Sequence, residues 1–210
     1  IVLVDNNNLN KSKHILKEKI VKINNGSFSQ KKSFIFKKNN NKIIFIGNIK
    51  YLPNKEACFN FVKKILPKIN KKFPEIEFHV IGEISILNKI MLKRYKNVKV
   101  LGPKKNLKPF IKNSICGISN LNIATGMQNK ILNYMSYGIP SICSFKSFNN
   151  SELKKGKDLL VYKHDDELIN FIFKIKKNKS LSNKISNNGY TKVKKSFNWD
   201  FVLKKYSKII

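Results

Sequence analysis

The sequence has little cysteine, little arginine and no long apolar run, and each shortage narrows the class of protein. No apolar stretch reaches the roughly 18 residues of a membrane-spanning helix. The three cysteines, Cys58, Cys116 and Cys143, are far apart in apolar surroundings and form no Cys-x-x-Cys pair. We expect them to be reduced core residues of a cytosolic protein rather than metal ligands.

Basic residues dominate the charge, but almost all of them are lysine. The 210 residues include 43 Lys and Arg against 12 Asp and Glu, and Arg94 is the single arginine. Proteins that read phosphates or bases depend on the bidentate guanidinium group, so a nucleic-acid-binding module is disfavoured. Lysine, asparagine and isoleucine are enriched together. This indicates a genome-wide drift in composition toward A-rich codons more than a basic surface patch selected for binding. A weak attraction to an anionic membrane surface stays open.

Strand-like and helix-like segments alternate along most of the chain. The apolar runs predict strands at 43–47, 76–82, 98–102, 115–119, 140–144 and 158–162. The segments between them predict helices at 54–72, 87–95, 107–112 and 126–137, and helical structure from 165 onward with a last helix at 199–206. This alternation predicts an α/β fold with a Rossmann-like parallel sheet and helices on both faces.

The first 41 residues differ from this pattern. We expect a strand at 1–5, a helix at 9–18 and a strand at 20–23, so that residues 1–25 form the tail of another domain. Residues 26–41 are predicted to be a linker, and residues 42–210 the main domain. No signal peptide is visible and the chain starts with Ile1, so we expect an N-terminal part to be missing.

The most informative segment is the start of the helix at 126–137. Gly126 stands where a strand and its loop give way to the helix. A helix start offers unpaired backbone N–H groups and the positive end of a dipole, and both favour an anion. Lys130 lies one turn in, with Asn133 beside it. These features predict a nucleotide diphosphate site, and the alternative is an ordinary connection with a solvated Lys130 and Asn133.

Glycines also follow several of the predicted strands. Gly47, Gly82 and Gly102 each end one. In open α/β sheets, ligands bind at the carboxyl ends of the strands. The glycines therefore favour a nucleotide crevice at this edge of the sheet.

The order of these segments resembles the C-terminal, donor-binding domain of a GT-B glycosyltransferase, close to glycosyltransferase family 4. The matching pieces are Phe45-Ile46-Gly47-Asn48 with Pro53-Asn54, Phe78-His79-Val80-Ile81-Gly82, Val98-Lys99-Val100-Leu101-Gly102, Gly126-Met127-Gln128-Asn129-Lys130-Ile131-Leu132 and Gly156-Lys157-Asp158-Leu159-Leu160-Val161. The Gly-x-Gln-Asn-Lys-x-Leu run is similar to a bacterial exopolysaccharide group of these enzymes. The resemblance covers residues 42–210, and the order and spacing of the pieces carry it.

The resemblance implies a domain that holds a nucleotide diphosphate sugar, within an enzyme that transfers the sugar to an acceptor hydroxyl in cell-surface polysaccharide or glycolipid synthesis. Lys130 would be the catalytic cation. The residues implied to bind the donor are Gly47 and Asn48 at the phosphates, Gly126, Met127, Gln128 and Lys130 in the diphosphate cradle, Gly102 and Pro103 at the base, and Asn133 at the ribose.

The chain departs from the family pattern at several of these positions. Thr125 and Asn133 stand where the family commonly has two glutamates, and Asn48 stands where it has an arginine, for which Lys50 or Lys55 would substitute. A degenerate copy that only binds is therefore an alternative. The sequence has no Asp-x-Asp triplet, so we expect no metal and no other cofactor. The acids at 165–167 are expected to open a helix.

The expected partners are a nucleotide-sugar donor and a carbohydrate or lipid-linked acceptor, the latter held by the missing N-terminal domain. No specific nucleic acid is expected. We predict a cytoplasmic location, peripheral on the inner face of the membrane, and a chain that binds its donor without transferring the sugar on its own.

Two competing hypotheses are a sugar-nucleotide epimerase of the same architecture and a basic module that binds nucleic acid or a membrane. The epimerase is disfavoured because the chain offers few acids and histidines for its catalysis.

Overall fold

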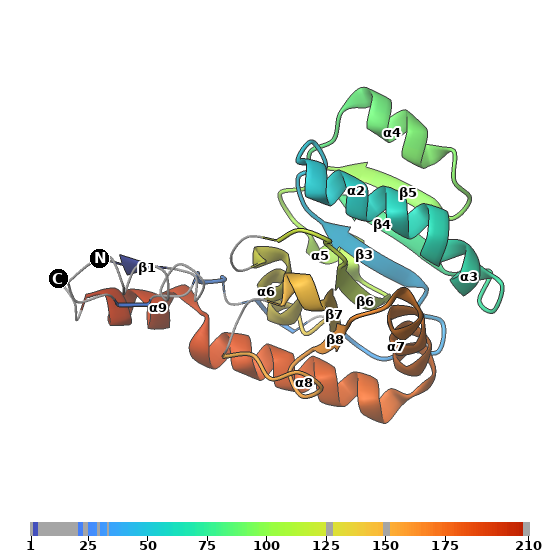
Figure 1. Ribbon diagram of the computed structural model, residues 1–210. Helices are drawn as coiled ribbons and strands as arrows, with labels where there is room; N and C mark the ends of the chain where they lie inside the picture. The colour runs from blue at the N-terminus through green and yellow to red at the C-terminus, as the bar shows by residue number, and fades with distance from the viewer. Residues whose placement is uncertain are drawn as a thin grey trace.

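The computed structural model describes residues 2–3, 21–22, 25–28, 30–32, 34–124, 128–148 and 152–207, and a six-stranded parallel sheet forms its centre (Figure 1). The strands are β3 (Lys42–Ile46), β4 (Glu77–Ile81), β5 (Val98–Gly102), β6 (Ser114–Ser119), β7 (Ser141–Ser144) and β8 (Leu160–Tyr162). They lie in the order β5-β4-β3-β6-β7-β8. Numbered within the sheet, this is the 3-2-1-4-5-6 order of dinucleotide-binding folds. The predicted fold class is confirmed.

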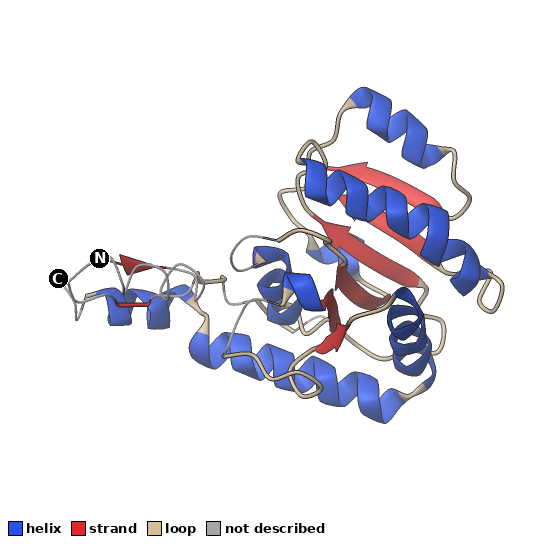
Figure 2. Ribbon diagram, viewed as in Figure 1, coloured by secondary structure: helices blue, strands red, loops and turns tan. Residues whose placement is uncertain are grey.

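Helices cover both faces of the sheet (Figure 2). One face carries α2 (Leu52–Asn60), a π-helical segment (Phe61–Ile65), α3 (Leu66–Asn70), α4 (Ile86–Lys93) and α7 (Asp165–Lys177). The other face carries α5 (Lys108–Ile111) and α6 (Asn129–Ser136). The long helix α8 (Lys179–Ser196) packs against both α6 and α7, and α9 (Trp199–Tyr206) follows it. Within the described residues, no helix combines the length and apolar character needed to cross a membrane.

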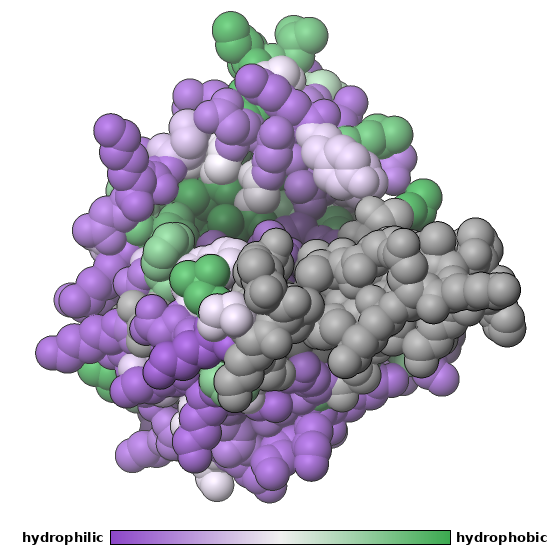
Figure 3. All heavy atoms as spheres, turned by 90° about the vertical axis from the view of Figure 1, so that its left-hand side faces the viewer, coloured by the Kyte–Doolittle hydropathy of each residue, from purple (hydrophilic) through white to green (hydrophobic). Residues whose placement is uncertain are grey.

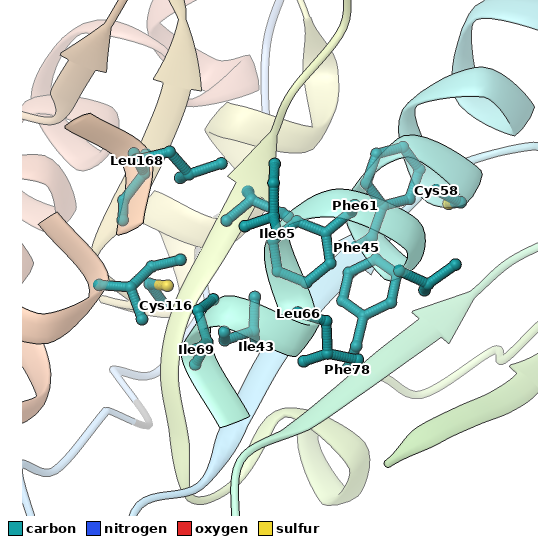
Figure 4. Close-up of a cluster of buried hydrophobic side chains, with 14 of the residues drawn as sticks. Ile43, Phe45, Cys58, Phe61, Ile65, Leu66, Ile69, Phe78, Cys116 and Leu168 are labelled. Atoms are coloured by element: carbon teal, nitrogen blue, oxygen red, sulfur yellow. The ribbon is translucent and has the colours of Figure 1, made fainter. Parts of the chain in front are cut away.

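The core follows the two-residue alternation of the strands. Ile43 and Phe45 of β3 point to the face covered by α2, α3 and α7, where the side chains drawn in Figure 4 pack together. On the same face the ring centroids of Phe61 and Phe78 lie 4.4 Å apart. Ile44 points to the opposite face, toward α5 and α6. The cysteines are buried and unpaired, as predicted, and burial raises the pKa of each thiol.

The helix predicted at 54–72 is not uniform. It begins at Leu52 and changes to π-helical geometry between Phe61 and Ile65, where the Leu66 N–H bonds to the Phe61 carbonyl. Pro67 follows and has no N–H to offer the preceding turn, so a wider turn relieves the mismatch.

The N-terminal region differs in part from its prediction. Two short strands, β1 (Val2–Leu3) and β2 (Val21–Lys22), form a separate parallel pair, and the helix predicted at 9–18 lies outside the described residues. The segment predicted as a linker runs along the main domain. The Ser27 N–H donates to the Phe197 carbonyl at 2.6 Å, and the Phe34 N–H to the Tyr137 carbonyl at 3.2 Å. The domain boundaries stay a prediction.

Tyr134 joins α6 to the two central strands. The ladder between β3 and β6 covers Lys42 to Ile44. Beyond it, the Tyr134 hydroxyl accepts a hydrogen bond from the Ile46 N–H at 2.8 Å and donates one to the Ile118 carbonyl at 3.1 Å. Its ring lies against Gly117, where a Cβ atom would be 2.3 Å from the ring. The hydroxyl therefore replaces the ladder where the strands part.

Tyr134→Phe should lower the free energy of unfolding by about 2–4 kcal/mol, because the Ile46 N–H and the buried Ile118 carbonyl lose their partner. Urea denaturation measures this. Tyr190→Phe is the matched control: that hydroxyl donates one bond to the Gln30 carbonyl, and its loss should cost about 1 kcal/mol. Equal losses in the two variants would contradict the bridging role.

Gly82→Ala should destabilise the fold by at least about 2 kcal/mol. Gly82 has a φ of +138°, and a Cβ atom there would lie 1.9 Å from the Gly47 carbonyl oxygen. Gly156→Ala is the comparison, because Gly156 also has a positive φ of +72° but faces open space. It should cost only about 1–2 kcal/mol for the left-handed conformation. Thermal denaturation of both variants tests the difference; a Gly82 variant as stable as the Gly156 variant would refute it.

Candidate functional site

The candidate site is the carboxyl edge of the sheet at β3 and β6. The chain order reverses between these two strands, and open α/β sheets bind ligands in the crevice formed there. In Figure 3, which looks at the left-hand side of Figure 1, the molecule is hollowed; hydrophobic residues are visible inside the hollow and hydrophilic residues lie above it. The first turn of α6 borders β3 at this edge, as the contacts of Lys130 show.

Lys130 is buried at the centre of this edge, with a relative exposure of 9%. Its Nζ donates to Asn54 Oδ1 at 2.6 Å and lies 4.6 Å from the centroid of the Phe45 ring. Three elements, α6, α2 and β3, therefore converge on one ammonium group. In the described part of the chain, no carboxylate forms an ion pair with it. The alternative of a solvated Lys130 is wrong.

Burial lowers the pKa of Lys130 from 10.5 to about 8, and the neighbouring Cys58 acts in the opposite direction. The amine is therefore mostly protonated at neutral pH. A protonated amine in a low-dielectric site attracts an anion much more strongly than a solvated one does. Strongly shifted groups of this kind are typical of functional sites.

Asn54 connects Lys130 to the turn after β3. Its Nδ2 donates to the Asn48 carbonyl at 2.9 Å, and a Cβ atom on Gly47 would lie 3.1 Å from the same nitrogen. The Asn48 side chain accepts a hydrogen bond from the Lys50 N–H at 2.9 Å, so it stabilises its own turn. The structure thus brings Gly47, Asn48 and Lys130 together.

Gly102 and Pro103 lie farther along the same edge, at the end of β5. The Gly47 N–H donates to the Ile81 carbonyl and the Gly82 N–H to the Gly102 carbonyl, each at 3.0 Å. These bonds keep the ends of β3, β4 and β5 in line. Gly102 has a φ of +69° with open space at its Cβ position, and Pro103 is exposed. The Gly102–Pro103 turn therefore faces solvent two strands away from Lys130.

The start of α6 is described from Gln128 onward. Gln128 is the N-cap residue, and its side chain makes no capping hydrogen bond to the first turn. Asn133 lies one turn further on, is half-buried, and its carbonyl accepts from the Ser136 hydroxyl at 2.8 Å. Thr125, Gly126 and Met127 lie outside the described residues.

The two lysines predicted to substitute for the family's arginine differ in their surroundings. Lys50 forms an ion pair with Glu83 at 3.4 Å, and both side chains are more than half exposed. Lys55 is half-buried on α2. The Glu83 carboxylate offsets part of the charge of Lys50, so Lys130 is the stronger cation for an anionic ligand.

A polar cavity of about 250 Å³ lies over the ends of β6, β7 and β8. Its lining includes Asn60, Asn120, Asn122, Ser144, Lys163 and Asp165. Asn120 is buried; its Nδ2 donates to the Ala57 carbonyl at 2.8 Å, and its Oδ1 has no protein partner. Among the described residues, no group of three or more His, Cys, Asp or Glu side chains could hold a metal ion.

Sequence reasoning missed Asn54, Phe45 and Tyr134 as parts of the site. Asn54 and Lys130 are separated by 76 positions, and Tyr134 and Ile46 by 88. No local pattern connects such pairs. The one available signal was an amide side chain directly after Pro53, at the start of a helix.

Comparison with known proteins agrees with the fold. Residues 40–178, more than half of the chain, match the sequence model of a family described as Glycosyl transferases group 1. The curated proteins gave no match.

Three solved structures illustrate the similarity in fold. A variant of S. aureus TarM bound to UDP and sugar ligands has a TM-score of 0.80 at 14% identity, and the match covers 99% of this chain and 43% of TarM. The pneumococcal O-GlcNAc transferase GtfA with UDP and GlcNAc has a TM-score of 0.74 at 15% identity, with 99% of this chain and 44% of GtfA covered. Sucrose-phosphate synthase from Thermosynechococcus elongatus has a TM-score of 0.79 at 12% identity, with 99% of this chain and 56% of the synthase covered. This chain thus spans roughly half the length of each. Since the family match covers all six strands of the parallel sheet and the fold agrees with that of GT-B glycosyltransferases, the chain belongs to the glycosyl transferases group 1 family.

Proposed function

We propose that this chain binds a nucleotide diphosphate sugar in the crevice between β3 and β6 and forms the donor site of a glycosyltransferase. The observation that supports this most is the buried ammonium group of Lys130, which has no carboxylate partner among the described residues. A diphosphate at the start of α6 would supply the missing negative charge. The backbone N–H groups of the first helical turn would add hydrogen bonds to the same anion.

The proposed chemistry is transfer of the sugar to an acceptor hydroxyl. The acceptor oxygen bonds to the anomeric carbon, the bond from that carbon to the diphosphate oxygen breaks, and the hydroxyl proton passes to a phosphate oxygen of the departing diphosphate. The leaving diphosphate gains negative charge as this bond breaks. Lys130 and the helix amides would therefore stabilise the transition state more than the ground state. We propose that this positive charge removes the need for a metal ion.

The neighbouring residues suggest how the nucleotide lies. Gly47, without a Cβ atom, would let the phosphates approach β3, beside the turn that Asn48 stabilises. Asn133, on α6, would bond to the ribose hydroxyls, and the open turn at Gly102 and Pro103 would hold the base. TarM and GtfA were solved with UDP bound, so a uridine nucleotide is the first ligand to test.

The finer assignment is also a proposal. The run that contains Lys130 supports family 4 and a bacterial exopolysaccharide enzyme, with a polysaccharide or lipid-linked acceptor. Asn48 and Asn133 stand at positions where the family has charged residues. Because a neutral amide makes weaker hydrogen bonds than a charged group, these two residues favour a donor site of modest affinity.

Lys130→Ala should weaken UDP binding by about 1.5–3 kcal/mol, as expected for a charge-assisted hydrogen bond. Asn133→Ala should cost about 0.5–1.5 kcal/mol, as for a neutral one. Isothermal titration calorimetry measures both. Lys177→Ala, an exposed lysine at the end of α7, is the control and should bind UDP like the original chain. Excess EDTA should leave the affinity unchanged. Undiminished affinity in the Lys130 variant would reject the proposed site.

Lys130→Met should raise the free energy of unfolding at pH 7 by about 1–3 kcal/mol, because it removes an unpaired buried charge and keeps the side-chain volume. The lowered pKa means that the unfolded chain binds more protons than the folded one between about pH 8 and 10.5. The original chain therefore gains stability as the pH rises through this range, and the advantage of the variant should disappear.

Lys176→Met is the matched control for this measurement. Lys176 is also buried, but its Nζ donates to the carbonyls of Lys38 and Asn40 and pairs with Glu75 at 3.2 Å. Its loss should destabilise the fold by about 1–3 kcal/mol. Denaturant titrations across the pH range test both variants, and a Lys130→Met protein less stable than the original at pH 7 would contradict the assignment of an unpaired charge.

A further inference from the structure

Helix α4 presents an apolar face to solvent. Ile86, Leu87, Ile90 and Met91 have relative exposures of 77%, 73%, 49% and 47%. Their spacing places them on one side of the helix, while Leu92 on the opposite side is buried in the core. α4 lies at the outer edge of the fold in Figure 1, and apolar residues protrude at the corresponding place at the top of Figure 3. None of these four side chains belongs to a hydrophobic cluster of the described residues, although apolar side chains on a monomer's surface are normally scattered.

Basic residues surround this face. Lys89, Lys93, Arg94 and Lys96 are all exposed, and Arg94 is the single arginine of the chain. The sequence has no acidic residue from Ile86 to Lys99. The acidic residue that precedes the helix, Glu83, pairs with Lys50. Lysines occur throughout the surface, but here they accompany a cluster of exposed apolar side chains.

We propose that α4 is a docking surface for an anionic phospholipid bilayer. The apolar side chains would enter the boundary between headgroups and acyl chains, and the lysines and Arg94 would contact lipid phosphates, as in interfacial amphipathic helices. The charge favours this occupant over a second copy of the chain, because a symmetric contact would place the same cations of two highly basic molecules against each other. The proposal uses none of the residues assigned to the donor site.

The test is flotation of the chain with vesicles of phosphatidylcholine alone or mixed with phosphatidylglycerol. The original chain should partition to the mixed vesicles. The variant Ile86→Ser/Leu87→Ser/Ile90→Ser should partition at least about tenfold more weakly, since burial of large apolar side chains is lost. The control Ile35→Ser/Leu203→Ser removes two exposed apolar side chains elsewhere and should stay within about twofold of the original. If the α4 variant binds like the original, net charge alone causes binding and the proposal is wrong.

A second measurement places the helix at the bilayer directly. The native cysteines are buried, so a fluorophore will label Leu87→Cys selectively. Its emission should shift to the blue with mixed vesicles, whereas the same label on Leu203→Cys should not respond. An unshifted Leu87 label would overturn the proposal. Sedimentation velocity tests whether this face instead binds a second copy of the chain. If the original chain is a dimer and the serine substitutions convert it to a monomer, the face serves self-association and the proposal is wrong.

Discussion

The geometry of the candidate site depends on the hydroxyl group of Tyr134. A parallel sheet can open at its carboxyl edge only if the backbone groups released there find other partners. One hydroxyl accepts from the Ile46 N–H of β3 and donates to the Ile118 carbonyl of β6. The absence of a side chain at Gly117 lets the ring lie close against the strand. Lys130 precedes Tyr134 by one helical turn on the same side of α6, so the bond that holds the sheet open also directs the lysine toward Asn54 and β3.

Lys130 shows how a binding site costs stability. The rest of the fold is held by apolar packing, and exposed ion pairs such as Lys68 with Asp166 add little. A buried, protonated amine without a carboxylate partner among the described residues opposes folding, and the lowered pKa expresses that cost. An anionic ligand would relieve it. The free energy lost in the empty protein would then reappear as affinity for the ligand, which is why such groups recur at functional sites.

The positive charge of the chain has two components that differ in structure. Most lysines are dispersed over every helix, as a drift in composition would leave them, and long-range attraction to any polyanion follows from their number alone. On α4 the cations surround exposed apolar side chains. Only that combination favours a lipid surface over other anions. Burial of apolar area in the bilayer adds a favourable binding free energy that salt does not screen.

The sequence by itself determined the elements of this protein, and the tertiary structure decided how they cooperate. Runs such as Ile43 to Phe45 and the amphipathic spacing of α6 and α7 are local patterns, so strands, helices, the parallel α/β class and the buried cysteines followed from them directly. The strand order, the π-helical segment before Pro67 and the hydrogen bonds of Ser27 and Phe34 to the main domain did not. Nor did the burial of Lys130, since a lysine one turn into a helix has the same local pattern whether it is solvated or enclosed. The partners that enclose it, Asn54 and Phe45, are brought near only when α2, α6 and β3 pack together, and periodicity carries no information about contacts between residues so far apart in the chain.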